Sequence, residues 1–392
     1  MKKIVLFEGD IETQGYFSLQ LAKAFEKLGH EVFVYDLEKP WEHSAKLLRF
    51  LERGNTVAVA FNFHGISGEV QFIDEDGVLL WDAFEIPFYN IVVDHPMYYY
   101  ELLSKRPKRY VQFSIDMEHS RFLSHYFPEV CQGGFLPLAG TSLYETGDYL
   151  PLKERPFDLV MTGNYASPSR FDKFKNRNGE EYALFYQGMI DELMADPEKN
   201  VIDVCTKHIR REIPEATHED LKMTMPNISF IDLIVRHVLR RDVVKTLVDH
   251  GYQVHVCGGR WEELECDHKE NLIMEGEMNS HSCLQAIAKS KISINVMPWF
   301  KEGAHDRIYN SMCNGAICLT DTNAYLRAFL QDGVNCMVYD PRALKKMPDY
   351  VGRMLENLEK GQQIADAGFR LAMQSETWAN RAKVLHDYMQ RA

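Results

Sequence analysis

The stretch "KKIVLFEGDIETQGYFSLQLAKAFEKLGHEVFVYDL" (Lys2–Leu37) indicates the fold of the chain. It opens with a compact apolar run of strand length, which a polar, glycine-bounded loop follows. Apolar residues then recur at helical spacing as far as Leu28, and Gly29 supplies a helix stop. A second apolar run, 31–37, predicts a second strand. Apolar strands that alternate with an amphipathic helix predict a parallel sheet covered by helices on both faces.

The same pattern continues through the first third of the chain. Further strands are predicted at residues 56–63, 88–94, 109–116 and 133–139. Between the first two, "GEVQFIDEDGVLLWD" (residues 68–82) is typical of a hairpin that turns at "DEDG". We therefore predict a Rossmann-like domain over residues 1–145. A polar, proline-containing segment, Tyr144–Pro156, is the expected linker.

The pattern then restarts in the second half. The expected strands are residues 157–165, 252–259, 271–277, 291–298, 316–321 and 335–340, and a long helical insertion is expected at about 180–250. These elements predict a second doubly wound domain over residues 157–375. A last helix at 376–392 has its own apolar stripe, and we expect it to cross back to the first domain. Ligands of such folds bind at the carboxyl ends of the strands.

Composition excludes several classes of function. The 44 basic and 57 acidic residues give a net charge of -13, which argues against nucleic acid as a partner. Eight cysteines without a close CxxC pair predict reduced thiols, with no structural metal and no disulfide frame. We see neither a signal peptide nor an apolar stretch of the roughly 20 residues that span a bilayer, and expect a cytoplasmic protein.

The densest group of reactive side chains lies between Lys301 and Asp321. A short helix is predicted at about 306–314, with Asp306 as its N-cap. Arg307 in the first turn and Asn310 one turn later can face the same ligand. A helix N-terminus with a guanidinium nearby suits a nucleotide diphosphate, although a polar loop with a routine capping aspartate has the same pattern.

Candidates for a general base lie at the strand ends of the first domain. Asp94 and His95 end a buried strand in "VDHP", and His64 stands beside a glycine loop in "FNFHGISG". Asp10, Glu12 and His119 are further candidates. Each of these side chains could deprotonate an acceptor hydroxyl, and each could equally have only a structural role.

The segment "GAHDRIYNSMCNGAICLTDTNAYLRAFLQDGVNCMVYD" (303–340) resembles the donor-binding motif of CgeB-type, spore-maturation-protein-like bacterial glycosyltransferases, relatives of the group 1 GT-B enzymes. The resemblance continues through "GYQVHVCGGRW", "MEGEMNSHSCLQAIAKSKISINV" and "SETWANRA", and so covers most of residues 250–392. It implies a GT-B fold of two facing Rossmann-like domains that acts without a metal.

The resemblance also implies roles for individual residues. Glu302 takes the position of the family's first motif glutamate, whereas Asn310 stands where the second, ribose-binding glutamate is expected. His305 and Arg307 would contact the diphosphate or sugar. The further donor-binding positions are Gly163 and Asn164 at the phosphates, and Arg260 within the 258–261 segment that borders the base.

The expected function is transfer of a sugar from a nucleotide-diphosphate sugar, a UDP-sugar by preference, to a protein or glycan acceptor, by a hexosyltransferase-type reaction without a cofactor. A nucleotide-sugar epimerase of the same fold and a non-catalytic surface or spore assembly protein are alternatives. Because neither half has GxGxxG after its first strand, a dehydrogenase is disfavoured.

Overall fold

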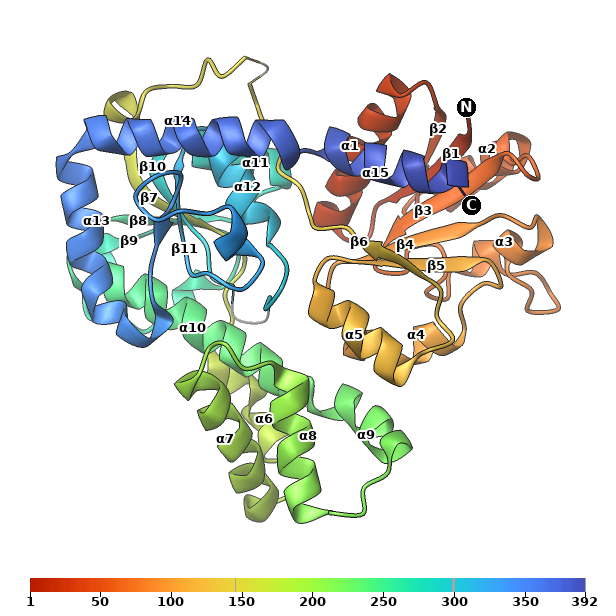
Figure 1. Ribbon diagram of the computed structural model, residues 1–392, viewed down its shortest axis with the longest axis horizontal. Helices are drawn as coiled ribbons and strands as arrows, with labels where there is room; N and C mark the ends of the chain where they lie inside the picture. The colour runs from red at the N-terminus through yellow and green to blue at the C-terminus, as the bar shows by residue number, and fades with distance from the viewer. Residues whose placement is uncertain (145, 298–299, 392) are drawn as a thin grey trace. The chain divides into compact units, whose positions relative to one another are not determined.

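The structure is a computed structural model that describes residues 1–144, 146–297 and 300–391. The chain divides into two compact units (Figure 1). Unit 1 comprises Met1–Ala139 with Glu376–Ala392, and unit 2 comprises Gly140–Ser375. The expected linker at 144–156 therefore lies inside unit 2, and its Glu145 is outside the described residues.

Unit 1 contains a parallel six-stranded sheet in the order β2-β1-β3-β4-β5-β6. Its strands are β1 (Lys3–Glu8), β2 (Glu31–Asp36), β3 (Thr56–Phe61), β4 (Phe88–Val92), β5 (Tyr110–Ser114) and β6 (Gln132–Phe135). Each lies within the range that the apolar runs predict, to within one residue. The chain runs from β1 to β2 and then returns to the other side of β1 for β3.

Helices cover this sheet. They are α1 (Glu12–Lys27), α2 (Pro40–Phe50), α3 (Leu80–Ala83), α4 (Tyr100–Ser104), α5 (Met117–Tyr126) and the C-terminal α15 (Trp378–Arg391). The return of the last helix to unit 1 is confirmed, since the Trp378 ring lies 5.0 Å from that of Phe17 in α1. Arg381 also donates to the carbonyl of Leu138 at 2.9 Å.

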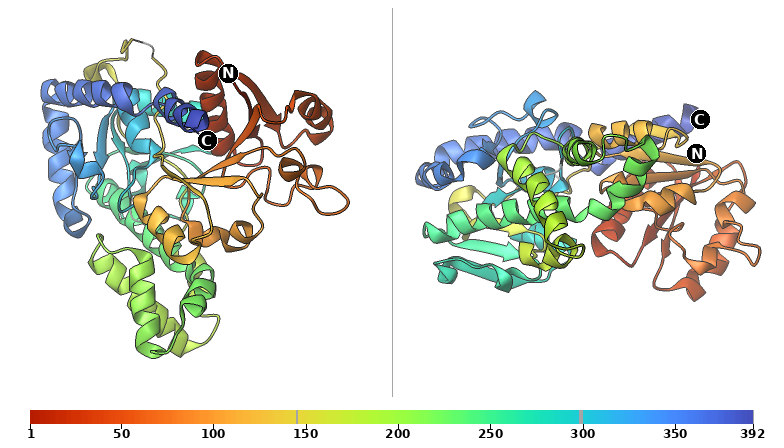
Figure 2. Two further views of the ribbon diagram at one scale, coloured as in Figure 1. Left: turned by 45° about the vertical axis from the view of Figure 1, so that its right-hand side comes forward. Right: turned by 90° about the horizontal axis from the view of Figure 1, so that it is seen from below.

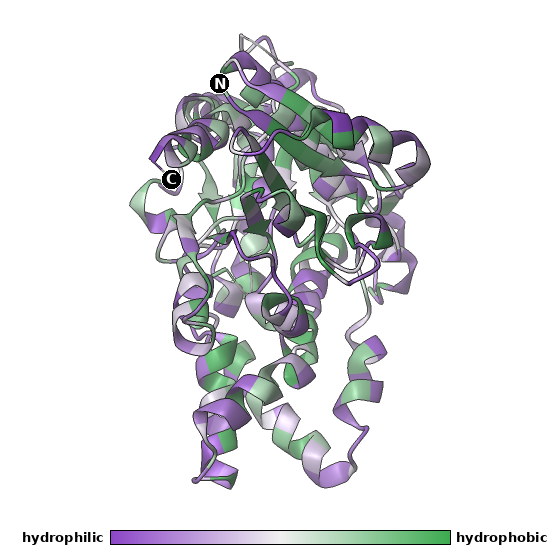
Figure 3. Cartoon of the chain, turned by 90° about the vertical axis from the view of Figure 1, so that its right-hand side faces the viewer, coloured by the Kyte–Doolittle hydropathy of each residue, from purple (hydrophilic) through white to green (hydrophobic). Residues whose placement is uncertain are grey.

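The core of unit 1 is unusually aromatic. Phe7 on β1 contacts the rings of Trp81 and Phe72 edge to face, at centroid distances of 5.7 and 5.9 Å. The strands are coloured mainly hydrophobic in Figure 3, while the helices change between hydrophobic and hydrophilic along their length. This difference is the one expected for strands buried on both faces and helices buried on one.

Unit 2 contains a second parallel six-stranded sheet, ordered β12-β11-β10-β7-β8-β9. Its strands are β7 (Phe157–Thr162), β8 (Val254–Cys257), β9 (Leu272–Gly276), β10 (Ser290–Ile294), β11 (Ile317–Thr320) and β12 (Met337–Val338). The strand predicted at 291–298 ends at Ile294 in the structure. Pro298, the last residue of the predicted range, lies outside the described residues. Asn295, which the sequence places inside that strand, directly follows it.

The helices of unit 2 fall into two groups. Four form an insertion after β7: α6 (Asp172–Lys175), α7 (Glu180–Ala195), α8 (Val201–Glu212) and α9 (His218–Thr224). The others are α10 (Phe230–Asp249), α11 (Ser280–Ala288), α12 (Asp306–Cys313), α13 (Met347–Glu356) and α14 (Leu358–Ser375). The insertion extends away from the sheet of unit 2 (Figure 2). Its helices span residues 172–224, whereas the expected range was 180–250, because α10 also contacts β8 and α13 and so belongs to the body of unit 2.

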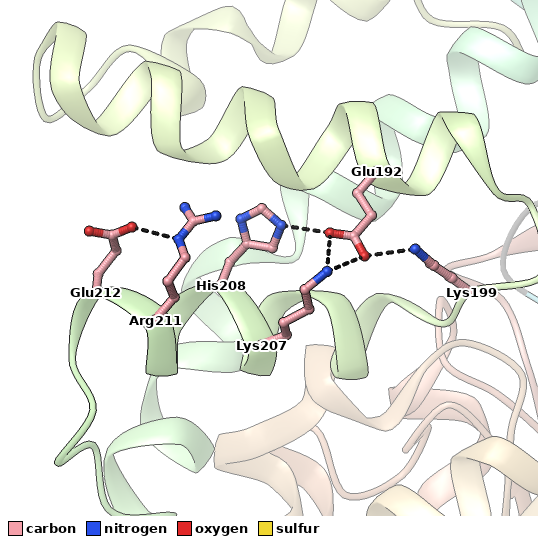
Figure 4. A network of polar contacts seen from close by, with 6 residues as sticks. All are labelled: Glu192, Lys199, Lys207, His208, Arg211 and Glu212. Atoms are coloured by element: carbon pink, nitrogen blue, oxygen red, sulfur yellow. Dashed lines mark hydrogen bonds and ion pairs between the residues drawn. The ribbon is translucent and has the colours of Figure 1, made fainter.

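A polar network joins the two longest insertion helices (Figure 4). The Glu192 carboxylate of α7 accepts hydrogen bonds from Lys207 and Lys199, both at 2.8 Å, and lies 2.9 Å from His208 Nε2. These cationic partners hold the pKa of Glu192 well below its usual range. The carboxylate therefore stays ionised and fixes α8 against α7.

The hairpin predicted at residues 68–82 is wrong. The turn at Asp74–Gly77 forms, with Gly77 N–H donating to Asp74 O at 3.0 Å, but a single antiparallel bridge, Ile73 to Leu79, takes the place of two strands. A short 3-10 helix, η1 (Val70–Phe72), and α3 flank the turn, because Phe72 and Trp81 are buried in the aromatic core. Across the described ranges, each helix is too short or too polar to cross a bilayer.

Candidate functional site

The strand order of unit 2 fixes the place where a ligand is expected. The chain runs from β7 outward to β8 and β9 and then returns to the other side of β7 for β10. The carboxyl ends of β7 and β10 are therefore the topological switch point of this sheet, where the loops diverge and leave a crevice. Thr162 ends β7, and Asn295 follows β10.

Arg307 bridges these two strand ends. Its Nε donates to Asn295 Oδ1 and its Nη1 donates to the Thr162 carbonyl, both at 3.1 Å. The side chain is only 8% exposed. Gly163 allows this approach, because its φ is 119° and a Cβ there would lie 2.8 Å from Arg307 Nη1. Arg307 therefore lies at the switch point of this sheet, and its contact with a diphosphate or sugar stays a prediction.

A second buried guanidinium, which sequence reasoning missed, belongs to Arg240 on α10. It donates to the Asn164 carbonyl, and its Nε has no hydrogen-bond partner among the described residues. Burial, and then the nearby Arg307 and Arg236, push the pKa of Arg240 well below its usual value. Its signal in the sequence is the i, i+4 spacing of Arg236 and Arg240 on one helix, which is also the pattern of any solvated basic helix face.

Arg240 and Arg307 are both buried cations whose charge is not neutralised by a carboxylate. Within the described ranges, neither guanidinium forms an ion pair with a carboxylate. Burial of a cation without an anionic partner costs free energy. Binding of an anion at the switch point would therefore stabilise both arginines. Two adjacent guanidinium groups match the two charges of a diphosphate.

The loops after β7 and β8 are locked together beside these cations. Asn164 Oδ1 accepts from Gly259 N–H at 2.8 Å, and Tyr165 N–H donates to the Gly259 carbonyl at 3.0 Å. Gly258 has a φ of 145°, and a Cβ there would lie 2.6 Å from the backbone of Gly163. These contacts hold the loops after β7 and β8 against each other, beside Arg240 and Arg307.

Trp261 and Arg260, which follow this loop, differ in burial. Trp261 is buried, donates from Nε1 to the Gly163 carbonyl at 3.0 Å, and stacks on Tyr165 at 5.2 Å. It is therefore a structural residue rather than an exposed platform for a base. Arg260 is exposed, with a left-handed φ of 67°.

Helix α12 brings the predicted donor-site residues together, with one correction. The N-cap is His305 rather than Asp306: His305 Nδ1 accepts from Arg307 N–H at 3.2 Å, and Asp306 is the first helical residue. Burial, and then Arg307, lower the pKa of His305 to about 4, so the imidazole is neutral at pH 7. Burial alone would raise the pKa of Asp306, but His305 and Arg307 lower it.

Glu302 and Asn310 are the two remaining candidates of this region. Glu302 is half-buried in the loop before α12. Asn310 uses its carboxamide within unit 2: Nδ2 donates to Asp306 Oδ2 and Oδ1 accepts from Thr141 N–H, both at 2.9 Å. Part of its hydrogen-bonding capacity is therefore committed to the protein itself.

The sheet of unit 1 has its own switch point, between β1 and β3. Here His64, after β3, lies with its Nε2 3.6 Å from Asp10 Oδ2, after β1. His64 is 3% exposed, and neither ring nitrogen has a hydrogen-bond partner in the described part of the chain. Burial lowers the pKa of His64, while Asp10 and Glu69 oppose the shift. The structure thus places the His64 imidazole next to the Asp10 carboxylate, without a hydrogen bond between them.

Asp94 and His95 are placed differently. Asp94 Oδ2 accepts hydrogen bonds from Asn62 Nδ2 at 2.8 Å and from the Tyr99 hydroxyl at 3.1 Å, so it anchors the loop that carries His64. His95 caps a 3-10 helix and is buried against the rings of His119 and Phe122, at 4.8 and 4.9 Å. Its imidazole packs in the core of unit 1.

Backbone strain is concentrated at the switch point of unit 1. Among the described residues, five non-glycine positions have positive φ, of which Asp10, Asn62 and Phe63 lie in the loops after β1 and β3, and Arg260 lies in the loop after β8. The fifth is Glu85. Left-handed non-glycine residues cost about 1 kcal/mol or more each and tend to persist at functional sites. No cluster of three or more His, Cys, Asp or Glu side chains suited to a metal ion occurs in the described ranges.

Comparison with known proteins agrees with this architecture. A family model described as glycosyl transferase-like matches residues 236–387, from α10 to α15. No curated protein sequence matches the chain. Among solved structures, HepE of Anabaena in complex with UDP-glucose aligns with a TM-score of 0.57, at 10% identity and over 100% of both chains.

Two further structures extend the comparison. Sucrose-phosphate synthase of Thermosynechococcus elongatus aligns with a TM-score of 0.56, at 10% identity, over 100% of this chain and 99% of its own. A glycosyltransferase of Rickettsia africae aligns with a TM-score of 0.54, at 9% identity, over 99% and 98%. The narrower resemblance to CgeB-type enzymes stays a prediction. The two parallel six-stranded sheets, with helices on their faces, are the GT-B fold of glycosyltransferases.

Proposed function

We propose that this protein is a glycosyltransferase that moves a sugar from a nucleotide-diphosphate sugar, with UDP as the favoured nucleotide, to a protein or glycan acceptor. The observation that carries the proposal is the pair of buried guanidinium groups, Arg240 and Arg307, which lack a carboxylate partner at the switch point of unit 2. The glycosyl transferase-like match over residues 236–387 covers both arginines. The UDP-glucose complex of a structural neighbour supports the same ligand class.

The donor diphosphate would lie between Arg240 and Arg307, near the N-terminus of α12. The dipole of that terminus favours an anion, and neutral His305 adds no charge of its own. When the bond between the anomeric carbon and the diphosphate oxygen breaks, the two guanidinium groups would stabilise the charge left on the leaving group. We propose that this arrangement serves in place of a metal ion.

The acceptor hydroxyl needs a base as its oxygen bonds to the anomeric carbon. His64 would take the proton, because its lowered pKa keeps the ring neutral near pH 7, and Asp10 would stabilise the imidazolium that forms. Asp94 and His95 remain candidate bases from the sequence. The contact of Asp94 with Asn62 favours positioning of the His64 loop over proton transfer, and His95 serves as the cap of a 3-10 helix.

The test is release of nucleoside diphosphate from UDP-, GDP- and dTDP-sugars by the full-length protein, with and without an extract of acceptors. We expect acceptor-dependent UDP release that Arg307→Met abolishes, while Arg211→Met on the exposed face of α8 leaves it unchanged. An isomerised sugar formed from the donor alone would favour an epimerase. Binding of a nucleotide sugar without any product would favour the non-catalytic alternative.

A further inference from the structure

The loops that surround His64 form one edge of the sheet of unit 1, with many carboxylates and several exposed apolar side chains. These side chains have no role in the proposed binding of the sugar donor. In register, Glu8 at the end of β1 lies beside Asp36 at the end of β2, and β3 pairs with the other side of β1. Because the three strands are parallel neighbours, the loops that follow them share one edge of the sheet. We refer to residues 8–12, 36–42 and 62–70 as the acceptor edge.

Apolar side chains are exposed on all three loops of the acceptor edge. Trp41, in the first turn of α2, is 96% exposed, Val70 is 82% exposed and Ile11 is 46% exposed. Directly beyond the acceptor edge, the Tyr35 ring lies 4.9 Å from Phe72 of η1 and 5.7 Å from His43 of α2, so η1 and α2 pack on the same side chain. A tryptophan with almost its whole surface in water leaves a large apolar area unburied, which is typical of a binding surface.

The charge of the acceptor edge is strongly negative. Carboxylates occur on each loop, at positions 8, 10, 12, 36, 38, 42 and 69. The single lysine, Lys39, is bonded to Asp36 at 2.8 Å, so its charge is already compensated. A ligand that carries phosphate or carboxylate would meet repulsion here, whereas hydroxyl and ammonium groups would find hydrogen-bond acceptors.

His64 is an independent sign that a polar ligand completes this edge. The ring is nine-tenths buried or more, yet both of its nitrogens lack a hydrogen-bond partner among the described residues. Its Nε2 points to the exposed Asp10 carboxylate at 3.6 Å, a separation beyond a hydrogen bond. A buried, unsatisfied imidazole is costly, and a ligand hydroxyl between His64 and Asp10 would satisfy both groups.

We propose that the acceptor edge binds a carbohydrate acceptor that carries no anionic group, either neutral or amine-bearing. This inference rests on the proposed glycosyl transfer and names the acceptor class for it. The Trp41 face, which is electron-rich, would lie against the C–H face of one sugar ring. The carboxylates would accept hydrogen bonds from its hydroxyl or ammonium groups, and an ammonium would add a cation–π contact.

The experiment is binding of the full-length protein, without nucleotide, to an immobilised panel of neutral, amine-bearing, and phosphate- or carboxylate-bearing oligosaccharides, with lysine-rich peptides as further members. The best oligosaccharide is then titrated by calorimetry. We expect neutral and amine-bearing oligosaccharides to bind and anionic ones to fail. Trp41→Ala should weaken binding about 5- to 10-fold, which corresponds to ~1–1.4 kcal/mol. Leu48→Ala is the matched control, since Leu48 is an exposed apolar residue two turns further along α2.

Three results would overturn the inference: preferential binding of anionic members, binding of lysine-rich peptides alone, or equal effects of Trp41→Ala and Leu48→Ala. Failure of the proposed function is distinguishable from these. If oligosaccharides bind through Trp41 but no nucleotide sugar binds, glycosyl transfer is wrong and the carbohydrate site stands. If UDP-sugar turns over while the oligosaccharides do not bind, only the acceptor inference is wrong.

Discussion

The charge state of two arginines dominates the chemistry at the residue scale. Arg240 and Arg307 are each 8% exposed and lie close enough to lower the pKa of Arg240 by mutual repulsion. In an unliganded protein, two buried like charges destabilise the fold, because the desolvation cost of each is not offset by an anion. A site of this kind lowers the stability of the unliganded fold and raises the affinity for an anionic ligand.

Arg240→Met should therefore affect stability and ligand affinity in opposite ways. Removal of the charge should leave the unliganded protein as stable as the wild type, or more stable by ~1 kcal/mol, because a buried unpaired cation is lost while its apolar stem is kept. The affinity for UDP-glucose should fall about tenfold or more. Chemical denaturation and calorimetric titration measure the two quantities. A variant that loses stability but keeps its affinity would show that Arg240 is only structural.

His64 and Asp10 predict a pH dependence of the reaction. A general base must be neutral, so kcat/KM should fall as the pH drops through the pKa of His64, which lies below its ordinary value. Asp10 raises that pKa, so Asp10→Asn should move the acid limb of the profile to lower pH. His64→Gln should reduce the rate about 10²- to 10⁴-fold without changing UDP-glucose affinity. An acid limb that Asp10→Asn leaves in place would contradict this pairing.

The α12 residues could be selected from the sequence as candidates because charge and helical spacing lie within a few consecutive positions, although the N-cap is His305 and not the expected Asp306. Arg240 was not identified, since it reaches the crevice from α10, which the insertion separates from β7 by sequence but not in space. Among the first-domain candidates, the sequence could not rank His64 against His95. Both follow strands, and only tertiary packing places His95 in the core.

At the element scale, the C-terminal end of α12 holds the first segment of unit 2. Asn314, the C-cap of α12, accepts from Leu143 N–H at its Oδ1 at 3.0 Å, and its Nδ2 donates to the Thr141 carbonyl at 2.8 Å. Gly140 lies flat on this helix, since a Cβ there would be 2.7 Å from the Tyr309 backbone. The helix of the candidate donor site and the first residues of unit 2 are therefore one packed assembly.

Asn314→Ala should consequently destabilise the protein. The side chain is fully buried, and its loss leaves the Leu143 N–H and the Thr141 carbonyl without their partners. We expect a loss of ~2–3 kcal/mol in the free energy of unfolding, measured by urea denaturation. Asn227→Ala, at an exposed position in the insertion, is the control and should stay within ~0.5 kcal/mol of the wild type. Equal effects of the two substitutions would refute the assigned role of Asn314.

The elements were predictable to different degrees. The twelve strands found in the described residues were all expected from apolar runs, because most of them are buried on both faces and have a strong, continuous signal. The failure at residues 68–82 has a physical reason. Phe72 and Trp81 join the aromatic core around Phe7, and this tertiary packing outweighs the alternating pattern that is typical of a hairpin.

At the scale of the whole molecule, buried histidines set the response to acid. His119 is buried without hydrogen-bond partners among the described residues, and burial lowers its pKa to about 3. In the unfolded chain its pKa is about 6.5, so protons bind the unfolded state first as the pH falls. Stability from this group is therefore present above pH 6.5 and is lost below it, by ~2 kcal/mol between pH 7 and pH 5.

His119→Leu should reduce this pH dependence while it preserves packing. The difference in unfolding free energy between pH 7 and pH 5 should shrink by ~2 kcal/mol relative to the wild type. Urea denaturation at the two pH values measures it. His281→Leu, at an exposed position on α11, is the control and should leave the difference unchanged. If His119→Leu has the same pH dependence as the wild type, the imidazole is not held neutral in the fold.

The proposed donor site depends on the binding of an anion by Arg240 and Arg307 at the switch point of unit 2. The most direct test is the thermal unfolding midpoint of the wild type and of Arg307→Met, with and without UDP-, GDP- and dTDP-sugars. At a ligand concentration about 100 times Kd, binding should add ~2.7 kcal/mol to the stability of the wild type and raise its midpoint by several degrees. The variant should not respond. The account is contradicted if none of these nucleotide sugars raises the wild-type midpoint, or if Arg307→Met responds as strongly as the wild type.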